Sequence, residues 1–179
     1  MFDVRLFQGA VVIRVRCAAL LLAVGLGTLP ASVNPSAAGD AASQFVGVWK
    51  LVSFERRQIG VDKVVKTYGE HPKGYRVHTA AGRMIYMFFA EDRKASVGDV
   101  TDADRIAWSK TMASAAGTYK LTGENRLVFY PEVSAVQYLL PITSGFEVKD
   151  NALIMTSDPI KDPAGGPDLY FRSAYERAE

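Results

Sequence analysis

A glycine and a tryptophan, Gly47 and Trp49, begin a strand-like run at residues 45–55. In a small barrel, one large side chain fills the closed end, and a nearby glycine lets the neighbouring backbone approach closely. Eight further strand-like runs follow, at residues 74–79, 83–90, 117–121, 126–131, 135–141, 145–149, 153–157 and 169–176. The sequence therefore predicts a β-barrel that Trp49 closes at one end, with Gly47 beside it.

Turn-forming residues lie between several of these runs, at Gly82, Gly123 and Asn151. Glycine and asparagine accept a positive φ, which tight hairpins require. The runs follow one another and do not alternate with helices, as they would around a parallel sheet. We therefore expect an all-β domain whose barrel is built from antiparallel strands.

One helix is expected to interrupt the strands. Thr101 is a suitable N-cap, and two aspartates follow in the first turn, where carboxylates interact favourably with the helix dipole. The helix is predicted to run to about residue 115. Ile106, Met112 and Ala113 would then face the barrel, so the fold would include one short packed helix.

The first 38 residues have the pattern of a secretory leader, with arginines before an apolar run at residues 18–29 and small residues after it. Cleavage is expected near residues 36–38 or residues 31–33. The apolar run is short for a membrane span, and an uncleaved anchor is the alternative. Cys17 precedes the apolar run, which does not fit a lipidation signal. We expect an exported protein, periplasmic or secreted, with a flexible linker at residues 39–44 and a barrel domain at residues 45–179.

Charge is balanced once the leader is set aside. The whole chain has 21 basic and 19 acidic residues, and three of the basic residues and one acidic residue lie in the leader. Nucleic acids and anionic membranes attract proteins that carry a clustered cationic excess. The charge balance therefore predicts neither a nucleic-acid nor an anionic-membrane surface, and it favours a small neutral or apolar partner. After leader cleavage we also expect no membrane span.

Alternation along the first run predicts a pocket wall. Trp49, Leu51, Ser53 and Glu55 fall on one face of a regular strand. If Trp49 points inward at the closed end, Ser53 and Glu55 rise toward the mouth of the barrel. The alternative is a solvated Glu55 at a strand end, because carboxylates are rarely buried without a partner.

Aromatic side chains in the predicted strands either line a cavity or fill the core. Arg83 could pair with a carboxylate through its planar guanidinium, and Met84, Tyr86 and Glu55 would complete a mixed set around it. The aromatic candidates are Tyr75, Tyr86, Phe88, Tyr119, Tyr130, Tyr138 and Phe171.

The sequence predicts no catalytic residue, metal site or cofactor. His71 and His78 are the two histidines, and no Cys/His cluster has the spacing of metal ligands. There is no Gly-x-Ser-x-Gly motif that would support a serine nucleophile, and no glycine-rich loop before a helix that would hold a phosphate. An enzyme is thus not the leading interpretation.

Four stretches resemble the lipocalin-like domain family of bacteria and fungi: residues 47–55, 68–75, 78–84 and 117–119. The resemblance covers most of the chain after the leader. It implies an up-and-down barrel of about eight strands, a packed helix and a central cavity. Family members often carry a histidine in the strand that corresponds to residues 127–134, where this chain has none.

The end of the chain also resembles this family, with aromatic residues followed by Arg172. The resemblance implies that Arg172 packs over Trp49 and shuts the barrel, and a cation over an indole contributes about 0.5–2 kcal/mol. The alternative is an exposed Arg172 on the outer face, because the register of a strand is hard to fix from sequence.

Three functions follow from these observations. The leading one is an exported barrel that binds a small hydrophobic or amphipathic molecule. The second is a cofactor-free isomerase or cyclase, which would work mainly by positioning its substrate and excluding water. The third is a structural module of the cell envelope with a filled barrel. A cavity would separate the third from the first two.

Overall fold

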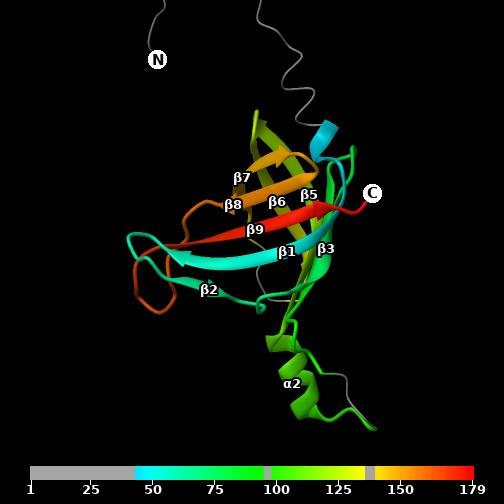
Figure 1. Ribbon diagram of the computed structural model, residues 1–179, viewed down its shortest axis with the longest axis vertical. Helices are drawn as coiled ribbons and strands as arrows, with labels where there is room; N and C mark the ends of the chain where they lie inside the picture. The colour runs from blue at the N-terminus through cyan, green and yellow to red at the C-terminus, as the bar shows by residue number, and fades with distance from the viewer. Residues whose placement is uncertain (1–42, 95–97, 136–139) are drawn as a thin grey trace, which may run out of the picture. The chain divides into compact units, whose positions relative to one another are not determined.

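The computed structural model describes residues 43–94, 98–135 and 140–179. Within them, nine strands form one antiparallel sheet that closes on itself (Figure 1). The strands are β1 (Gly47–Gln58), β2 (Val64–Lys66), β3 (Lys73–His78), β4 (Arg83–Phe89), β5 (Met112–Gly123), β6 (Arg126–Ser134), β7 (Ile142–Lys149), β8 (Ala152–Ser157) and β9 (Leu169–Arg177).

Eight of these strands make the barrel wall. Each strand from β3 to β8 pairs with the next one along the chain, and β1 pairs with both β3 and β9 to close the wall. The short β2 pairs only with the end of β1, from Glu55 to Arg57. The predicted all-β antiparallel barrel of about eight strands is confirmed.

Two parts of the strand prediction differ from the structure. The sequence pattern missed β2, which is only three residues long and has no clear alternation. Of the run predicted at residues 135–141, residues 136–139 lie outside the described residues, and the flanking Ala135, Leu140 and Pro141 are not in a strand.

The predicted helix exists as α2 (Asp102–Lys110), and Thr101 caps it. The Asp104 carboxylate accepts a hydrogen bond from the Thr101 backbone at 2.9 Å, and the Asp104 N–H donates to Thr101 Oγ1 at 3.2 Å. This reciprocal capping box fixes the start of the helix. The helix ends earlier than predicted, because β5 already begins at Met112.

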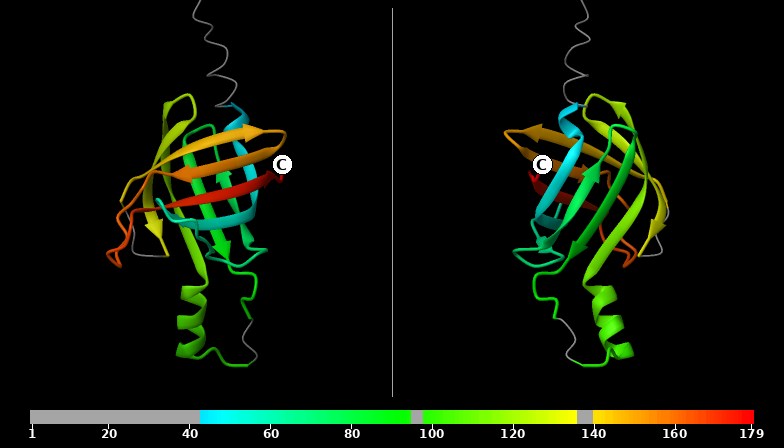
Figure 2. Two further views of the ribbon diagram at one scale, coloured as in Figure 1. Left: turned by 60° about the vertical axis from the view of Figure 1, so that its left-hand side comes forward. Right: turned by 90° about the vertical axis from the view of Figure 1, so that its right-hand side faces the viewer.

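The packing predicted for this helix is not observed. No residue of α2 is buried, and Ile106 is 55% exposed. Figure 2 shows the helix standing off the barrel rather than along its wall. Ala113 does pack against the core, but from β5. In the described part of the chain, no helix is long and apolar enough to cross a membrane.

Large side chains fill one end of the barrel, which we call the closed end and define by Phe45, Trp49, His78, Tyr119 and Arg177. Phe45 and Trp49 are fully buried, and the Trp49 indole N–H donates to the Phe45 carbonyl at 3.0 Å. The Phe45 ring stacks on His78 with centroids 3.8 Å apart. Large, interlocked side chains therefore fill this end.

An arginine completes the closed end, but it is Arg177 rather than Arg172. The Arg177 guanidinium lies 4.2 Å from the centroid of the Trp49 ring. Its Nη1 donates to the Val46 carbonyl at 3.1 Å, and its Nη2 donates to the Gln44 carbonyl. A Cβ on Gly47 would meet Arg177 Nη1 at 2.6 Å, so the glycine leaves room for this side chain.

The prediction for Arg172 is therefore wrong. In β9, Phe171, Ser173 and Tyr175 point into the barrel, and Arg177 continues this face. Arg172 lies on the opposite, outer face and pairs in register with Glu55. Side chains alternate between the two faces of a strand, so Arg172 cannot share the inner face with Phe171 and Ser173. Arg177 can, and it lies one residue beyond the predicted end of this strand.

Candidate functional site

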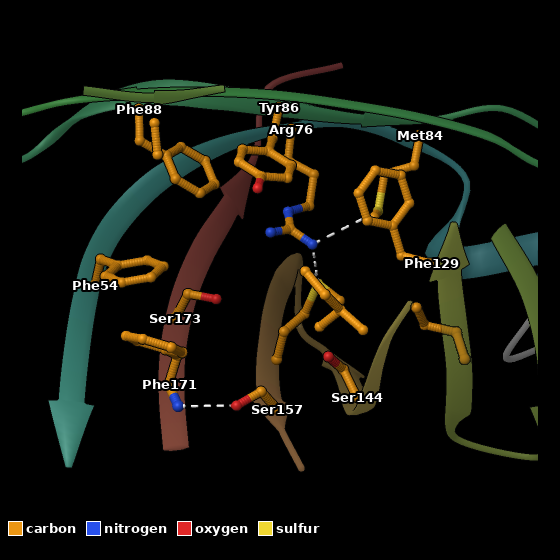
Figure 3. A pocket seen from close by; sticks show the side chains of 14 residues that line it. Phe54, Arg76, Met84, Tyr86, Phe88, Phe129, Ser144, Ser157, Phe171 and Ser173 are labelled. Atoms are coloured by element: carbon orange, nitrogen blue, oxygen red, sulfur yellow. Dashed lines mark hydrogen bonds between the residues drawn. The ribbon is translucent and has the colours of Figure 1, made fainter. Parts of the chain in front are cut away.

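The middle of the barrel is not filled, and it contains a cavity of about 120 Å³ (Figure 3). Every strand of the eight-stranded wall contributes to the lining. Most of the side chains are aromatic or aliphatic, and the exceptions are one arginine and three serines. The lining residues are Phe54, Arg76, Met84, Tyr86, Phe88, Ala113, Leu127, Phe129, Ile142, Ser144, Met155, Ser157, Phe171 and Ser173.

Arg76 is the only charged residue in this described lining, and only 8% of it is exposed. It lies on β3, where alternation turns Arg76 and His78 inward and Tyr75 outward. Figure 3 shows its side chain reaching into the cavity, with Ser144 and Ser173 across from it. A fixed positive charge therefore faces an otherwise apolar space.

The guanidinium of Arg76 touches sulfur atoms and aromatic rings. Its Nη1 lies 3.0 Å from Met155 Sδ and 3.6 Å from Met84 Sδ. Its central carbon lies 5.0 Å from the ring centroid of Tyr86 and 5.3 Å from that of Tyr175. Thioether sulfur is a weak acceptor, so these contacts leave the donors of the guanidinium poorly satisfied.

No carboxylate compensates this charge within the residues that the structure describes. Arg76 Nε has no hydrogen-bond partner there, and Arg76 forms none of the ion pairs. An arginine donates five N–H groups and is always charged. Burial of such a group without an anion is costly, and cation–π contacts offset only part of that cost.

The tyrosines around Arg76 do not supply the missing negative charge. Burial raises the pKa of Tyr86, although the charge of Arg76 acts in the opposite direction. Burial also raises the pKa of Tyr175, against smaller lowering effects of Arg76 and Ser173. Both phenols are therefore neutral near pH 7, and Tyr86, which lines the cavity, offers it a hydroxyl group rather than a phenolate.

His78, the histidine next to this site, is also held in its neutral form. Burial, and then the charge of Arg76, hold the pKa of His78 well below its ordinary value. Its Nε2 lies 3.1 Å from Met84 Sδ, and its Nδ1 lies 3.3 Å from the Phe45 carbonyl. His78 is thus a neutral part of the closed end. Among the described residues, no group of three or more His, Cys, Asp or Glu side chains is placed to hold a metal ion.

A second, larger pocket of about 940 Å³ adjoins the inner cavity. The two spaces share four lining residues, Phe54, Tyr86, Ile142 and Phe171. Burial raises the pKa of Tyr68, which lines the outer pocket, to about 12. The remaining outer lining mixes prolines and aliphatic residues with three charged ones: Arg56, Val65, Lys66, Thr67, Pro131, Pro141, Thr143, Asp158, Pro159 and Ile160.

The structure places Ser53 and Glu55 away from both pockets, contrary to the prediction. The pairing of β1 with β9 shifts between Leu51 and Ser53, which marks a bulge. A bulge adds one residue to the strand, so the inward face continues at Phe54 instead of Ser53. Glu55 forms an ion pair with Arg57 at 2.8 Å.

Of the predicted tyrosines, only Tyr86 lines the inner cavity among the residues described. Tyr75 is 52% exposed on the outer face of β3, and Tyr130 is also exposed. Tyr119 is buried at the closed end, where its hydroxyl donates to the Thr79 carbonyl at 2.8 Å. Tyr138 lies outside the described residues. Phe88 and Phe171, named with the tyrosines, do line the cavity.

The prediction that Arg83 lies in the pocket is wrong. The side chain of Arg83 is 56% exposed and forms two hydrogen bonds of 2.8 Å to the Glu132 carboxylate. The cavity contains Arg76 instead. Alternation separates Arg83 from Met84 and Tyr86, because adjacent residues of β4 point to opposite faces, but it does not say which face is the inner one.

Comparison with known proteins agrees with this architecture. Residues 46–162 match the model of a family described as a lipocalin-like domain. No curated protein matches the chain. The family match covers more than half of the chain and includes β1 to β8, which carry most of the cavity lining.

Proposed function

The chain belongs to the lipocalin-like domain family, and from that premise we propose that it binds a small amphipathic molecule inside the barrel. The observation that carries this proposal is the pair of adjoining cavities, of about 120 Å³ and about 940 Å³. Sites for small organic ligands usually measure roughly 300–1,000 Å³ and have mostly apolar walls with a few polar groups. The two spaces together fit this description.

The lining supports binding over a filled structural barrel. Phe54, Tyr86 and Phe171 contribute to both spaces and offer aromatic surface to a ligand that extends from one into the other. A purely structural barrel would fill its interior with side chains. Here the buried core includes Phe88, Phe129 and Met155 in the middle of the barrel, yet these side chains leave the inner cavity open between them. No observation on the described residues specifically favours turnover.

A neutral fluorescent probe tests the proposal. N-phenyl-1-naphthylamine becomes bright in apolar surroundings, and we expect the protein to bind it saturably with a stoichiometry of one. The Ser144→Phe variant places a ring in the inner cavity and should weaken binding. The matched Ser53→Phe variant changes a serine that lines neither pocket and should bind normally. Absence of saturable binding by the wild-type protein would contradict the proposal.

We also propose that the protein acts outside the cytoplasm, on the basis of the leader pattern at residues 1–38. Expression of the full chain in a bacterial host, followed by fractionation and N-terminal sequencing, tests this. We expect a shortened chain in the periplasm or medium. A cytoplasmic chain that still begins at Met1 would contradict it.

A further inference from the structure

We propose that Arg76 binds the anionic group of the ligand, so that the ligand is an amphipathic monoacid whose head group enters the inner cavity. This inference rests on the proposed function and adds the chemical class of the ligand. It predicts a carboxylate, or an anion of similar shape, at the end of an apolar chain or ring system that reaches the outer pocket.

The state of the guanidinium is the first support. Arg76 is buried, its Nε lacks a hydrogen-bond partner among the described residues, and its Nη1 donates to the weakly accepting sulfur atoms of Met84 and Met155. A planar guanidinium matches a carboxylate through two parallel hydrogen bonds. An anionic ligand would therefore supply the acceptors that the surrounding side chains do not.

The polar groups near Arg76 are the second support. Ser144 and Ser173 are buried, and Figure 3 shows them on the wall opposite the guanidinium. Both hydroxyls can donate to a carboxylate held by Arg76. Tyr86 and Tyr175 remain protonated and so do not compete as anions for the guanidinium.

The sizes of the two spaces determine the orientation of the ligand. The inner cavity, at about 120 Å³, accommodates a head group and a few further atoms but not a whole organic ligand. Phe54, Tyr86, Ile142 and Phe171 border both spaces, so an apolar tail that leaves Arg76 would pass between them into the outer pocket. The charged end would thus lie deep in the barrel.

A matched pair of ligands tests this inference. Decanoate and decanol have the same chain, and only decanoate is charged at pH 8. Each is titrated against protein loaded with N-phenyl-1-naphthylamine. For the wild-type protein we expect decanoate to bind about 10- to 100-fold more tightly than decanol, the range typical of hydrogen bonds to a charged group.

The preference for the acid should depend on Arg76. In Arg76→Met we expect decanoate and decanol to bind about equally well, with decanol affinity close to that of the wild-type protein. Arg83→Met is the matched control, since it removes an arginine outside the cavity, and it should keep the full preference. If Arg76→Met does not fold, as judged by circular dichroism, Arg76→Gln replaces it under the same criterion.

The outcomes separate this inference from the proposed function. If decanol binds as tightly as decanoate to the wild-type protein, or if Arg76→Met keeps the preference, the anion site is wrong while ligand binding stands. If neither compound nor the probe binds, the proposed function itself fails. A preference that Arg76→Met abolishes supports the inference, and decyl sulfate then shows whether the site requires a carboxylate.

Discussion

Two buried regions of the barrel each place an arginine against aromatic rings, yet the two arginines are in opposite states. At the closed end, Arg177 lies over Trp49 and donates to the carbonyls of Val46 and Gln44. In the cavity, Arg76 lies near Tyr86, its Nε has no hydrogen-bond partner, and it forms no ion pair with a carboxylate among the described residues. Contact with aromatic rings therefore does not by itself reveal what an arginine does.

The difference lies in the hydrogen bonds rather than in the rings. A guanidinium that reaches backbone carbonyls is satisfied by the fold, so Arg177 contributes to stability. A buried guanidinium without such acceptors carries an uncompensated desolvation cost. We infer that the fold tolerates this cost at Arg76 because a ligand offsets it, and the following substitutions test that division between a structural end and a binding centre.

The largest effect is expected for Trp49→Ala. Trp49 is fully buried at the closed end, and replacement of such a side chain by alanine typically costs about 3–5 kcal/mol. Urea unfolding measures the loss. Trp108→Ala is the matched control, because Trp108 lies on α2, where no residue is buried. This variant should lose less free energy of unfolding than Trp49→Ala. If both variants lose the same free energy of unfolding, Trp49 at the closed end does not stabilise the fold more than an exposed helix residue does.

The two arginines should respond differently to the same substitution. Arg177→Met removes a cation–π contact and two hydrogen bonds, and we expect a loss of about 1–3 kcal/mol in the free energy of unfolding. Arg76→Met replaces an unpaired buried charge with an apolar side chain, so ligand-free stability should stay unchanged or rise. Urea unfolding without ligand measures both. A large loss for Arg76→Met would show that Arg76, too, is structural.

The closed end also predicts a pH dependence through His78. Its pKa in the folded protein lies well below 6.5, so the unfolded chain binds a proton that the folded chain does not bind between these two values. Stability should therefore fall as pH decreases below about 6.5, by up to about 1.4 kcal/mol per pH unit. Urea unfolding from pH 8 to pH 5 measures this slope.

His78→Phe is the control for this slope, because the new ring can still stack on Phe45 but cannot titrate. The variant should lose the part of the slope that His78 causes, whatever its stability at pH 8. If the slopes of wild-type protein and variant coincide, His78 takes up a proton in the folded barrel, and the closed end is less well sealed than its packing indicates.

The general architecture could be predicted from the sequence because it depends on the presence and order of the elements, which can be recognised without knowing the exact boundaries or register of each strand. Strand-like runs, turn residues and the N-cap Thr101 identified the barrel and its helix, and Trp49 indicated where the closed end lies. The direction of individual side chains could not be predicted in the same way. A single extra residue in β1, between Leu51 and Ser53, reverses the face of everything after it, including Glu55.

The choice of arginine failed for a related reason. Arg83 was grouped with Met84 and Tyr86, although adjacent residues of a strand point to opposite faces. The register of the hairpin pairs Arg76 with Tyr86 and His78 with Met84, so these four side chains share the inner face. Sequence alone gave no reason to prefer this face over the other, because both carry an arginine, a tyrosine and apolar residues.

The smallest effect is expected for Arg83→Met, which separates the predicted arginine from the observed one. Arg83 and Glu132 form an exposed ion pair, and such pairs contribute about 0–1 kcal/mol. Urea unfolding at low and high salt should detect a small difference at most, and salt should reduce it further. Affinity for decanoate should be unchanged, because the side chain lies outside the cavity. A loss of decanoate affinity as large as that of Arg76→Met would mean that the anion is bound on the outer wall, and Arg76 and Arg177 would then no longer differ in function.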